Sequence, residues 1–410
     1  MTTTDISLAL LLGPQLEAFA AAGYSVVGVS APGPFVAGLG AAGIGHVALR
    51  HATRSFSPVA DAMAAAELHG VFRRLRPDIV HTHNPKPGVY GRLAARAAGV
   101  PAVVNTVHGL YATRTDAWPR RAVVYGLERL AAACSDAELV QNPEDLETLA
   151  GLGVPRDRLH LLGNGVDLDR FRRGPQTADA RRKVRGELGV GDGTVVVGAV
   201  GRLVWEKGYA ELFAAASELR RREPGGPATG AGRGGGAGGA GHPEIAVVVA
   251  GPTEPGKADG IGAPEMATAE AAGVRFLGHR ADVEDLYAAF DIYVLASHRE
   301  GFPRSAMEAA AMGLPVVATD IRGCRQVVDH EVTGLLVPAR DPGALAAAVG
   351  RLAGDAALRA AMGAAAAAKS GAEFDQRRVI DTTLAVYRTL LSERQGRGKE
   401  NLPARPEPHR

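Results

Sequence analysis

Residues 297–308 of the chain read SHREGFPRSAME, and this stretch decides the fold. The apolar run 292–296 precedes it and is typical of a buried strand, and a second apolar run, 316–318, follows it. Between the two runs, residues 309–312 favour helix. The segment therefore predicts a strand, a turn, a helix and a second strand within a parallel sheet.

The turn in this segment carries polar groups suited to binding. Gly301 and Pro303 make it tight, and Ser305 or Arg304 lies near the first helical turn, where backbone N–H groups lack partners and attract anions or sugar hydroxyls. Glu300 stands on the loop, and Glu308 stands about one turn into the helix. Across such a corner the two carboxylates can reach two parts of one extended ligand.

The pattern resembles a known family. Glu300 and Glu308 are separated by seven residues and followed by AAAMGLPVVATD, which is similar to the signature of the family 4 retaining glycosyltransferases. Two glutamates at this spacing are common by chance, and the strand, Gly-Phe-Pro turn, helix and Gly-Leu-Pro context makes the resemblance specific. It covers nearly the whole chain and implies the GT-B fold, an α/β architecture of two Rossmann-like doubly wound domains facing across a cleft.

The expected domain organisation follows from this resemblance and from composition. We expect an acceptor-side domain at 1–170 and a nucleotide-sugar-binding domain at 171–372. A helix at 373–391 is expected to cross back to the first domain, and a disordered tail is expected at 392–410. Residues at about 223–242 are mostly Gly, Ala and Pro. They cannot bury enough apolar area to offset ordering, so they predict a disordered surface loop.

Composition sets the class of protein. The chain has 410 residues, of which 46% are hydrophobic and 22% charged, with a net charge of +2, so no nucleic-acid footprint is present. Cys134 and Cys324 show no metal or redox spacing. No apolar run approaches the roughly 20 residues that span a bilayer, and Asp5 near the start argues against a signal peptide. A cytoplasmic protein is expected.

The first residues predict the opening of a doubly wound domain: a strand at 6–12, a helix at 15–22 and a strand at 26–30. The family often has a glycine-rich turn after its first strand, facing the donor phosphate. Gly13 is the one glycine at this place. Close backbone approach of the donor at Gly13 is therefore predicted, without a rich phosphate cradle.

Residues 38–43, GLGAAG, match the G-x-G-x-x-G pattern of dinucleotide-binding proteins. That motif must follow directly on a strand and open a helix. Here a loop intervenes, and the glycines fall at the end of a small-residue helix that stops at Gly43. This placement argues against an NAD-dependent dehydrogenase.

Histidines follow two strands of the first domain. HTHNPKP at 81–87 lies at the carboxyl end of a strand predicted at 79–82, and His108 ends the strand predicted at 103–107. Open α/β sheets bind ligands at such ends. The family often has a histidine near the position of His108, close to the sugar, where it would orient a hydroxyl or steady charge. A purely structural role of His108 is equally open.

The second domain begins with a strand at 194–200, followed by GRLVWEKG at 201–208. Without a metal, cations and N–H dipoles must stabilise the leaving diphosphate of a sugar donor. By the resemblance, Arg202 and Lys207 bind the donor phosphates. The alternative is a pair of solvated loop cations.

The resemblance also assigns the remaining donor contacts. Glu308 would accept hydrogen bonds from ribose hydroxyls, and Glu300 would contact the donor sugar. Backbone N–H groups of the segment Gly301, Phe302, Pro303 and Arg304, in which proline has none, would help to orient this sugar. Backbone groups near His279 and Arg280 would meet the base, and Gly251 would line the same cleft. The predicted catalytic residues are Glu300, His108, Arg202 and Lys207. No general base is assigned, because in retaining enzymes of this type the departing phosphate takes the acceptor proton.

Asp167-Leu168-Asp169 is nominally a D-x-D motif, the Mn²⁺ motif of another glycosyltransferase fold. That motif needs a short strand ending at a nucleotide site, and residues 163–166 do not form one. A turn is favoured. No metal and no cofactor are expected, since the nucleotide sugar is a substrate.

The first domain most resembles enzymes that build capsule, exopolysaccharide or glycan-precursor units on polyprenyl-diphosphate-linked acceptors. A set of arginines would then contact anionic headgroups at the inner face of the plasma membrane, with solvated arginines as the alternative. These are Arg73, Arg74, Arg76, Arg114, Arg120 and Arg121.

The predicted function is transfer of a sugar from a nucleotide diphosphate donor, UDP-hexose or UDP-N-acetylhexosamine, with retention and without a metal. A GDP-mannose-dependent mannosyltransferase and a hydrolysing nucleotide-sugar epimerase are alternatives within the fold. The epimerase would need acid–base groups in a pattern that the chain lacks. A catalytically inactive glycan-binding protein is disfavoured, because the two cations and two glutamates are all present.

Overall fold

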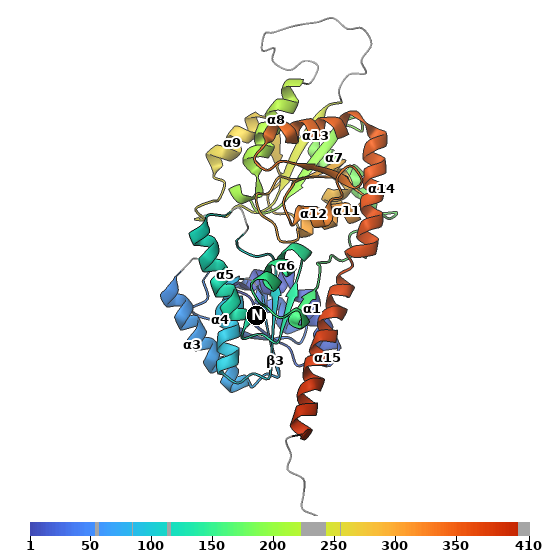
Figure 1. The fold of residues 1–410 in the computed structure, drawn as a ribbon. Coiled ribbons are helices and arrows are strands. Elements are labelled where there is room, and N and C mark those ends of the chain that lie inside the picture. Colours follow the sequence, from blue (N-terminus) through green and yellow to red (C-terminus); the bar gives the residue numbers. More distant parts are fainter. Residues whose placement is uncertain (54–56, 84, 113–115, 223–242, 255, 401–410) are drawn as a thin grey trace, which may run out of the picture. The chain divides into compact units, whose positions relative to one another are not determined.

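A computed structural model describes residues 1–410 except 54–56, 84, 113–115, 223–242, 255 and 401–410 (Figure 1). The chain forms two compact units. The first comprises Met1–Gly163 and Arg377–Arg410, and the second comprises Asn164–Gln376. The chain thus divides after residues 163 and 376, where the sequence placed the boundaries after 170 and 372.

The first unit holds two sets of parallel strands. β1 (Val27–Ser30) pairs with β2 (Gly45–Ala48), and a second sheet has the order β3-β4-β5-β6. Its strands are β3 (Ile79–His83), β4 (Ala102–Val107), β5 (Ala137–Val140) and β6 (Leu159–Leu161). Residues 1–3 connect the two sets: the Thr2 N–H donates to the carbonyl of Val29 (2.9 Å), and the His83 N–H donates to that of Met1 (3.0 Å).

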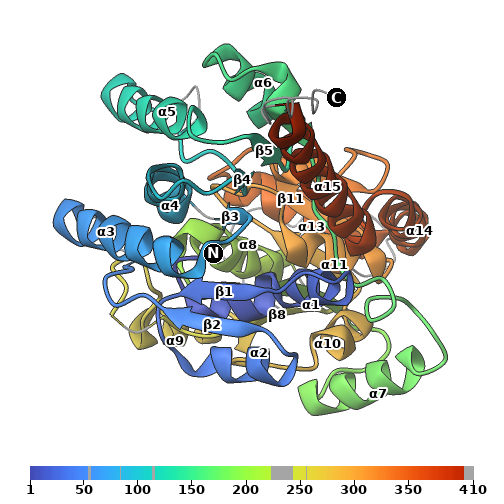
Figure 2. The same cartoon turned by 90° about the horizontal axis from the view of Figure 1, so that it is seen from below.

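Helices of the first unit cover both faces of its four-stranded sheet. They are α1 (Gly13–Ala21), α2 (Ala37–Ala41), α3 (Pro58–Leu75), α4 (Pro85–Ala97), α5 (Trp118–Ala132), α6 (Pro143–Gly151) and α15 (Gln376–Glu400), with short turns η1 (Ser7–Leu11), η2 (Pro34–Val36) and η3 (Arg156–Arg158). Figure 2 shows α3, α4 and α5 as neighbours on one side. On the other side, Phe19 of α1 and Leu384 and Tyr387 of α15 pack with Val104 and Leu139 of the sheet.

The predicted strand at 6–12 is wrong. Residues Ser7–Leu11 form a π-helical turn, and α1 begins directly after Leu12. The run is apolar but consists mostly of Leu and Ala, which favour helix, and Ile6 is its one β-branched residue. The expected helix at residues 38–43 is confirmed, because α2 ends at Ala41 and Gly43 adopts the left-handed conformation with φ of +72°.

The second unit has one parallel sheet of six strands in the order β12-β11-β10-β7-β8-β9. The strands are β7 (Val195–Val200), β8 (Ile245–Ala250), β9 (Val274–Phe276), β10 (Ile292–Leu295), β11 (Val316–Thr319) and β12 (Gly334–Val337). The order runs outward from β7 in both directions, so β7 and β10 flank a topological switch point, where doubly wound sheets bind their ligands. The strands predicted at 194–200, 292–296 and 316–318 are each confirmed to within one residue.

Two buried clusters fill the faces of this sheet. Phe290 and Met307 belong to one, and Leu203 and Leu212 belong to the other. The covering helices are α7 (Thr177–Leu188), η4 (Trp205–Lys207), α8 (Tyr209–Arg222), α9 (Ala263–Ala271), α10 (Val283–Ala289), α11 (Arg304–Ala311), α12 (Cys324–Val327), α13 (Pro342–Gly354) and α14 (Ala356–Glu373). Helix α11 starts at Arg304, one of the two residues that the sequence places near the first helical turn.

Two predicted disordered segments have different outcomes. The insert at about 223–242 lies outside the described residues. The tail predicted from 392 is wrong in part, because α15 continues to Glu400. The residues at 392–400 include Glu, Arg, Gln and Lys, which favour helix, and the first proline comes only at Pro403. Residues 401–410 lie outside the described part.

Candidate active site

The candidate site of the second unit lies where β7 and β10 end. Gly201 and Arg202 follow β7, Gly251 follows β8, and Ser297 to Glu300 follow β10. Since these strands are parallel neighbours, their carboxyl ends meet at one edge of the sheet. That edge at the switch point is the predicted ligand-binding position.

Lys207 and Glu300 form the central pair of this edge. The Lys207 Nζ lies 2.5 Å from Oε1 of Glu300, and the Ser297 hydroxyl donates to the same oxygen at 2.7 Å. Ser297 is buried, and its own carbonyl accepts a hydrogen bond from the Thr319 hydroxyl. Lys207 and Glu300, which the sequence assigns separately to the donor phosphates and the donor sugar, are thus in contact, and Glu300 is held by two donors.

A short loop brings Lys207 to this position. Gly208 ends the turn η4 with φ of +73°, and a Cβ at Gly208 would lie 1.9 Å from the carbonyl oxygen of Ala296. The loop is also tied to the neighbouring strand end, because Arg299 forms an ion pair with Glu206. Only glycine fits at residue 208, both for its conformation and for the space.

Glu308 lies inside the unit, within α11. The Tyr287 hydroxyl, from α10, donates to Oε2 of Glu308 at 3.0 Å. Burial raises the pKa of the Glu308 carboxyl above its ordinary value, while the positive charge of Arg304 and the hydrogen bond from Tyr287 act in the opposite direction. Glu308 is half-buried by its accessible surface. A partly desolvated carboxylate costs free energy unless it is well paired, which favours a ligand-binding role over a structural one.

Glu308→Gln is expected to raise the free energy of unfolding of the second unit at neutral pH and to lower sugar transfer. Because the folded-state pKa of Glu308 is raised, ionisation destabilises the folded unit as the pH rises from the ordinary value of 4.5 through the raised one. Gln cannot ionise, so its advantage should open across this window and vanish below it. Urea unfolding measured at several pH values tests the window, and equal stability at all pH values would contradict it.

Arg202 also lies at this edge, but its ion pair is with another residue. Its Nη1 is 3.4 Å from Oε1 of Glu254, and 42% of its side chain is exposed. The structure therefore brings Lys207 and Glu300 into contact and leaves Arg202 on the neighbouring strand end, paired with Glu254. Phosphate binding by Arg202 stays a prediction.

Close backbone contacts explain why residue 251 is glycine. A Cβ at Gly251 would lie 1.8 Å from the carbonyl oxygen of Gly201, and the Gly251 N–H donates to the carbonyl of Gly278 at 2.8 Å. Gly251 therefore joins the ends of β7 and β8 to the residues after β9. The predicted lining of the site by Gly251 agrees with its place at this edge and remains a prediction.

His279 and Arg280 follow β9. The Arg280 guanidinium binds Asp282 at 2.6 Å and Glu187 at 2.9 Å, and its hydrogen bonds lower the pKa of Asp282 to about 2. This side chain is occupied by carboxylates within the unit. Any contact of His279 and Arg280 with a nucleotide base is then best made by their backbone groups, as predicted.

The turn at 301–304 opens α11. The Phe302 ring packs edge-on against Phe374, with 5.7 Å between ring centroids. The backbone carbonyl of Phe302 accepts a hydrogen bond from the side-chain amide of Asn164 at 3.0 Å. Pro303 is the residue before the first helical position, which Arg304 occupies. The first backbone N–H groups of α11 are thus presented beside the loop that carries Glu300.

His108 joins a group of histidines in the first unit. Its Nε2 lies 3.1 Å from Nδ1 of His83, and the ring of His81 stacks on that of His83 with centroids 4.1 Å apart. His81 further bonds the hydroxyls of Tyr387 (2.5 Å) and Thr106 (2.7 Å). Burial lowers the pKa of His81 and His83 well below 6.5, so both are neutral at pH 7. Asn84 of the same motif lies outside the described residues.

The prediction of a strand-end turn at Gly13 is wrong, because Gly13 is the first residue of α1. A Cβ at Gly13 would meet nothing within 4 Å. No close neighbour in the described structure therefore excludes a larger side chain at residue 13. The assignment of Gly13 to donor binding depended on a strand-end turn, which the structure does not have at this place.

Gly13→Ala is expected to stabilise the first unit by about 0.5 kcal/mol, because alanine favours helix over glycine, and to leave sugar transfer unchanged. Thermal unfolding and a transfer assay check both. Gly38→Ala is the matched control, since a Cβ there also meets nothing within 4 Å. A large loss of transfer specific to the residue 13 variant would restore the phosphate-contact hypothesis.

Several residues of the site could not be found from the sequence. Tyr287 and Ser297 hold the two glutamates, and a Cβ at Gly323 would lie 2.5 Å from the carbonyl oxygen of Glu300. The D-x-D motif is a turn, in which the Asp167 carboxylate accepts from the N–H groups of Asp169 and Arg170. Among the described residues, no three His, Cys, Asp or Glu side chains are grouped as metal ligands.

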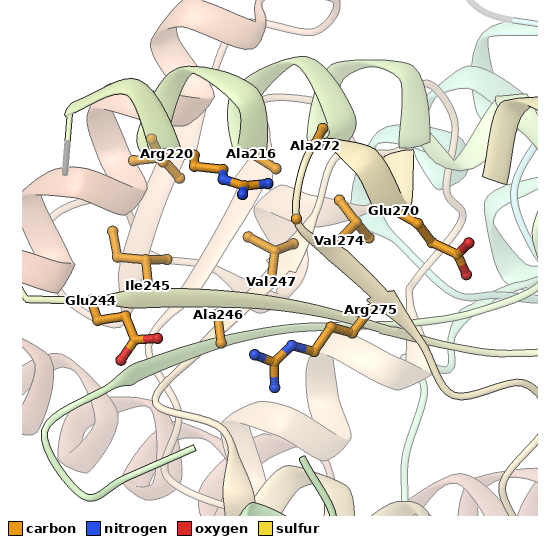
Figure 3. Close-up of a pocket in the computed structure, with 12 residues that line it drawn as sticks. Ala216, Arg220, Glu244, Ile245, Ala246, Val247, Glu270, Ala272, Val274 and Arg275 are labelled. Atoms are coloured by element: carbon orange, nitrogen blue, oxygen red, sulfur yellow. The ribbon is translucent and has the colours of Figure 1, made fainter. Parts of the chain in front are cut away.

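A hollow of about 340 Å³ lies at the opposite edge of the same sheet (Figure 3). Arg220, Glu244, Ile245, Val274 and Arg275 contribute to its lining. Ile245 and Val274 are the first residues of β8 and β9, so this hollow is at the amino ends of the strands. It is separate from the edge that carries Lys207 and Glu300.

Two α/β units of parallel strands, with a lysine–glutamate pair at the switch point of the second, agree with the expected GT-B class of glycosyltransferases. The family described as "Glycosyl transferases group 1" matches residues 180–369, and "Glycosyltransferase Family 4" matches residues 15–170. The chain belongs to glycosyltransferase family 4, and it is a glycosyltransferase.

Curated relatives agree with this assignment. The D-inositol 3-phosphate glycosyltransferase of Saccharomonospora viridis is 31% identical over 79% of this chain and 72% of its own. The UDP-Gal:alpha-D-GlcNAc-diphosphoundecaprenol alpha-1,3-galactosyltransferase of Escherichia coli is 29% identical over 70% of this chain and 69% of its own.

Solved structures share the fold. Anabaena HepE, in complex with UDP and glucose, has a TM-score of 0.73 at 21% identity, covering 93% of this chain and 95% of its own. The sucrose-phosphate synthase of Thermosynechococcus elongatus has a TM-score of 0.74 at 22% identity, covering 94% and 93%. The predicted GT-B architecture is thus confirmed.

Proposed function

We propose that the protein transfers a sugar from a nucleotide diphosphate donor, a UDP-hexose or UDP-N-acetylhexosamine, to a glycan or polyprenyl-diphosphate-linked acceptor. The observation that carries the donor proposal is the contact of Lys207 with Glu300 at the switch point of the second unit. The printed activity of the Escherichia coli relative, a UDP-Gal-dependent transferase acting on a diphosphoundecaprenol-linked sugar, supports both donor and acceptor.

Each side chain has a task in this proposal. Lys207, with Arg202 beside it, neutralises the charge that builds on the leaving diphosphate. Glu300 holds the Lys207 ammonium before the donor arrives and then accepts a sugar hydroxyl. Glu308 accepts hydrogen bonds from the ribose, with its second oxygen held by Tyr287. The departing phosphate takes the acceptor proton on the same face of the sugar, which gives retention. His108 orients the acceptor or the sugar.

A second acceptor class has support of its own. Several relatives at 31–34% identity are named D-inositol 3-phosphate glycosyltransferases, which favours a small phosphorylated polyol as acceptor. The two classes differ in solubility, so one assay with both acceptors separates them. No specific observation favours the GDP-mannose or epimerase alternatives.

Donor binding is tested by thermal shift with UDP, GDP, ADP and NAD. Stabilisation by UDP above the other three supports the proposal, and stabilisation by GDP alone moves the donor to GDP-mannose. Sugar release from UDP-galactose, UDP-glucose and UDP-N-acetylglucosamine is then measured with lipid extract or inositol phosphate as acceptor. NMR of the product reports the anomeric configuration, and inversion would contradict retention.

A chelator is expected to leave the transfer rate unchanged, because cationic side chains and N–H groups supply the positive charge in this proposal. The measurement compares rates with and without EDTA after dialysis of the enzyme. Loss of transfer that Mn²⁺ restores would contradict metal independence and return Asp167 and Asp169 as candidate ligands.

The proposed location is the cytoplasm, with peripheral contact at the inner face of the plasma membrane. Across the helices of the described part, none is long and apolar enough to span a bilayer. Of the arginines assigned to headgroup contact, Arg114 lies outside the described residues. Arg73, Arg74 and Arg76 lie at the end of α3, and Arg120 and Arg121 lie in α5.

A further inference from the structure

Two segments of the second unit contact each other through ionisable side chains. One segment, 206–211, includes the end of η4 and the start of α8, and the other, 298–300, follows β10. Each segment has three ionisable side chains, and each of these is paired with one from the other segment. The pairs are Glu206–Arg299 at 2.5 Å, Lys207–Glu300 at 2.5 Å and Glu211–His298 at 2.9 Å.

The Glu211–His298 pair is shielded from solvent more than the outer pair of this set. The side chains of Arg299 and Glu206 are 34% and 36% exposed, and ion pairs at such positions contribute little to stability. The side chains of His298 and Glu211 are 24% and 12% exposed. Because water screens this contact less, it is expected to hold the two segments together more firmly.

The carboxylate of Glu211 depends on His298 for a partner. Its Oε1 lies 2.9 Å from Nε2 of His298, whereas its Oε2 is buried and has no hydrogen-bond partner within the described part of the chain. A glutamate in the first turn of a helix also interacts favourably with the helix dipole, and this explains an acid at residue 211. The dipole does not require a histidine at residue 298, so the contact needs a separate explanation.

His298 is attached to the segment of Lys207 at two points. Its backbone N–H donates to the carbonyl of Glu206 at 2.9 Å, and its ring contacts Glu211. These two glutamates lie on either side of Lys207 in the chain. His298 also stands two residues before Glu300, whose Oε1 accepts from the hydroxyl of the buried Ser297. The contacts of His298 therefore help to set where Glu300 lies relative to Lys207.

We propose that His298, acting through Glu211, is a positioning residue for sugar transfer. It fixes the segment 297–300 on α8, so that Glu300 stays beside the donor sugar while Lys207 stays at the diphosphate. The inference rests on the proposed function and adds to it two residues that touch neither sugar nor diphosphate. Misplacement of a binding group by about 1 Å can lower a rate on the order of a hundredfold, so a contact outside the reacting groups can have a large effect.

The first test compares two amide replacements of His298 in the full-length protein. The side-chain nitrogen of glutamine can replace the imidazole Nε2, whereas that of the shorter asparagine corresponds to Nδ1 and does not reach Glu211. His298→Asn should lower single-turnover transfer at saturating UDP-sugar by about tenfold to a hundredfold, and His298→Gln should keep most of the rate. The affinity of both variants for UDP alone should equal that of wild type, because UDP has no sugar for Glu300 to contact. Partial unfolding would instead lower the amount of UDP bound.

A double-mutant cycle tests whether His298 acts through Glu211. If the two side chains work as a pair, His298→Asn combined with Glu211→Ala should slow transfer no more than either substitution alone. His330→Ala is the matched control. The ring of His330 accepts a hydrogen bond from the Leu336 N–H at 2.9 Å, and His330 precedes β12, so it lies at the opposite edge of the same sheet. His330→Ala should keep the wild-type rate.

Three results would overturn the proposal. One is an equal rate for His298→Asn and His298→Gln in folded proteins that bind UDP. Another is a cycle in which the effects of the His298 and Glu211 substitutions multiply. The third is a loss of rate in His330→Ala as large as that in His298→Asn, which would indicate a general loss of rigidity. A wild-type protein that transfers no sugar from any UDP donor would refute the proposed function and this inference together, whereas an active wild type with unaffected variants would refute the inference alone.

Discussion

Lys207→Ala is expected to lower the turnover of sugar transfer by about a hundredfold to a thousandfold, the usual loss when one stabiliser of developing charge is removed. In the structure the Lys207 ammonium lies 2.5 Å from Glu300 at the switch point. Its removal deprives the departing diphosphate of this cation and leaves Glu300 with the Ser297 hydroxyl but without the ion pair. Single-turnover rates at saturating donor measure the chemical step directly.

A matched lysine in the same unit serves as control. Lys369 of helix α14 pairs with Asp329 at 2.6 Å. Lys369→Ala should leave the rate unchanged. Arg202→Ala should also slow turnover, because its guanidinium lies at the neighbouring strand end. A rate near wild type for Lys207→Ala, in a protein that unfolds normally, would remove Lys207 from the catalytic groups.

Gly208→Ala is expected to destabilise the second unit by roughly 3 kcal/mol, adding left-handed strain to steric overlap. The residue has φ of +73°, and the new Cβ would lie 1.9 Å from the Ala296 carbonyl oxygen. Because Lys207 precedes it, relief of this overlap would also move the ammonium away from Glu300. Urea unfolding and the transfer rate should both report the change.

The control separates strain from overlap. Gly278 also adopts a positive φ, +65°, but a Cβ there meets nothing within 4 Å. Gly278→Ala should therefore show only the conformational part of the cost, about 1 kcal/mol. Equal unfolding midpoints for the two variants would mean that the Ala296 carbonyl yields easily, and the rigid-loop interpretation would be wrong.

Much of the fold could be predicted because the strands of the second unit are short apolar runs between glycines and prolines. The run at 292–296 is of this kind, and the turn after it marks the start of the next helix near Arg304. The run at 6–12 failed because leucine and alanine satisfy a strand pattern and a helix pattern equally over so few residues. Its helical outcome depends on packing against Leu39 and Ile44, which the sequence does not reveal.

The candidate site was predictable where a residue follows a strand. Lys207 and Glu300 lie in loops that follow strands, and they are in contact. Like Glu308, which lies within α11, they were assigned to donor binding through the resemblance of their motifs to the family. The supporting groups were not predictable, because Tyr287 lies in another helix and its hydroxyl reaches Glu308 only through the packing of α10 on α11. Gly13 was misplaced because its assignment depended on the first strand.

Helix α15 has a consequence for biosynthesis. Its Tyr387 packs on Phe19 and Tyr24 and bonds His81, more than 300 positions earlier in the chain. The second unit, Asn164–Gln376, is contiguous and is complete before α15 is translated. At roughly 5–20 residues per second, the nascent first unit waits tens of seconds on the ribosome for its last helix. During that interval its apolar surface is a substrate for chaperones, and the second unit is the first to finish folding.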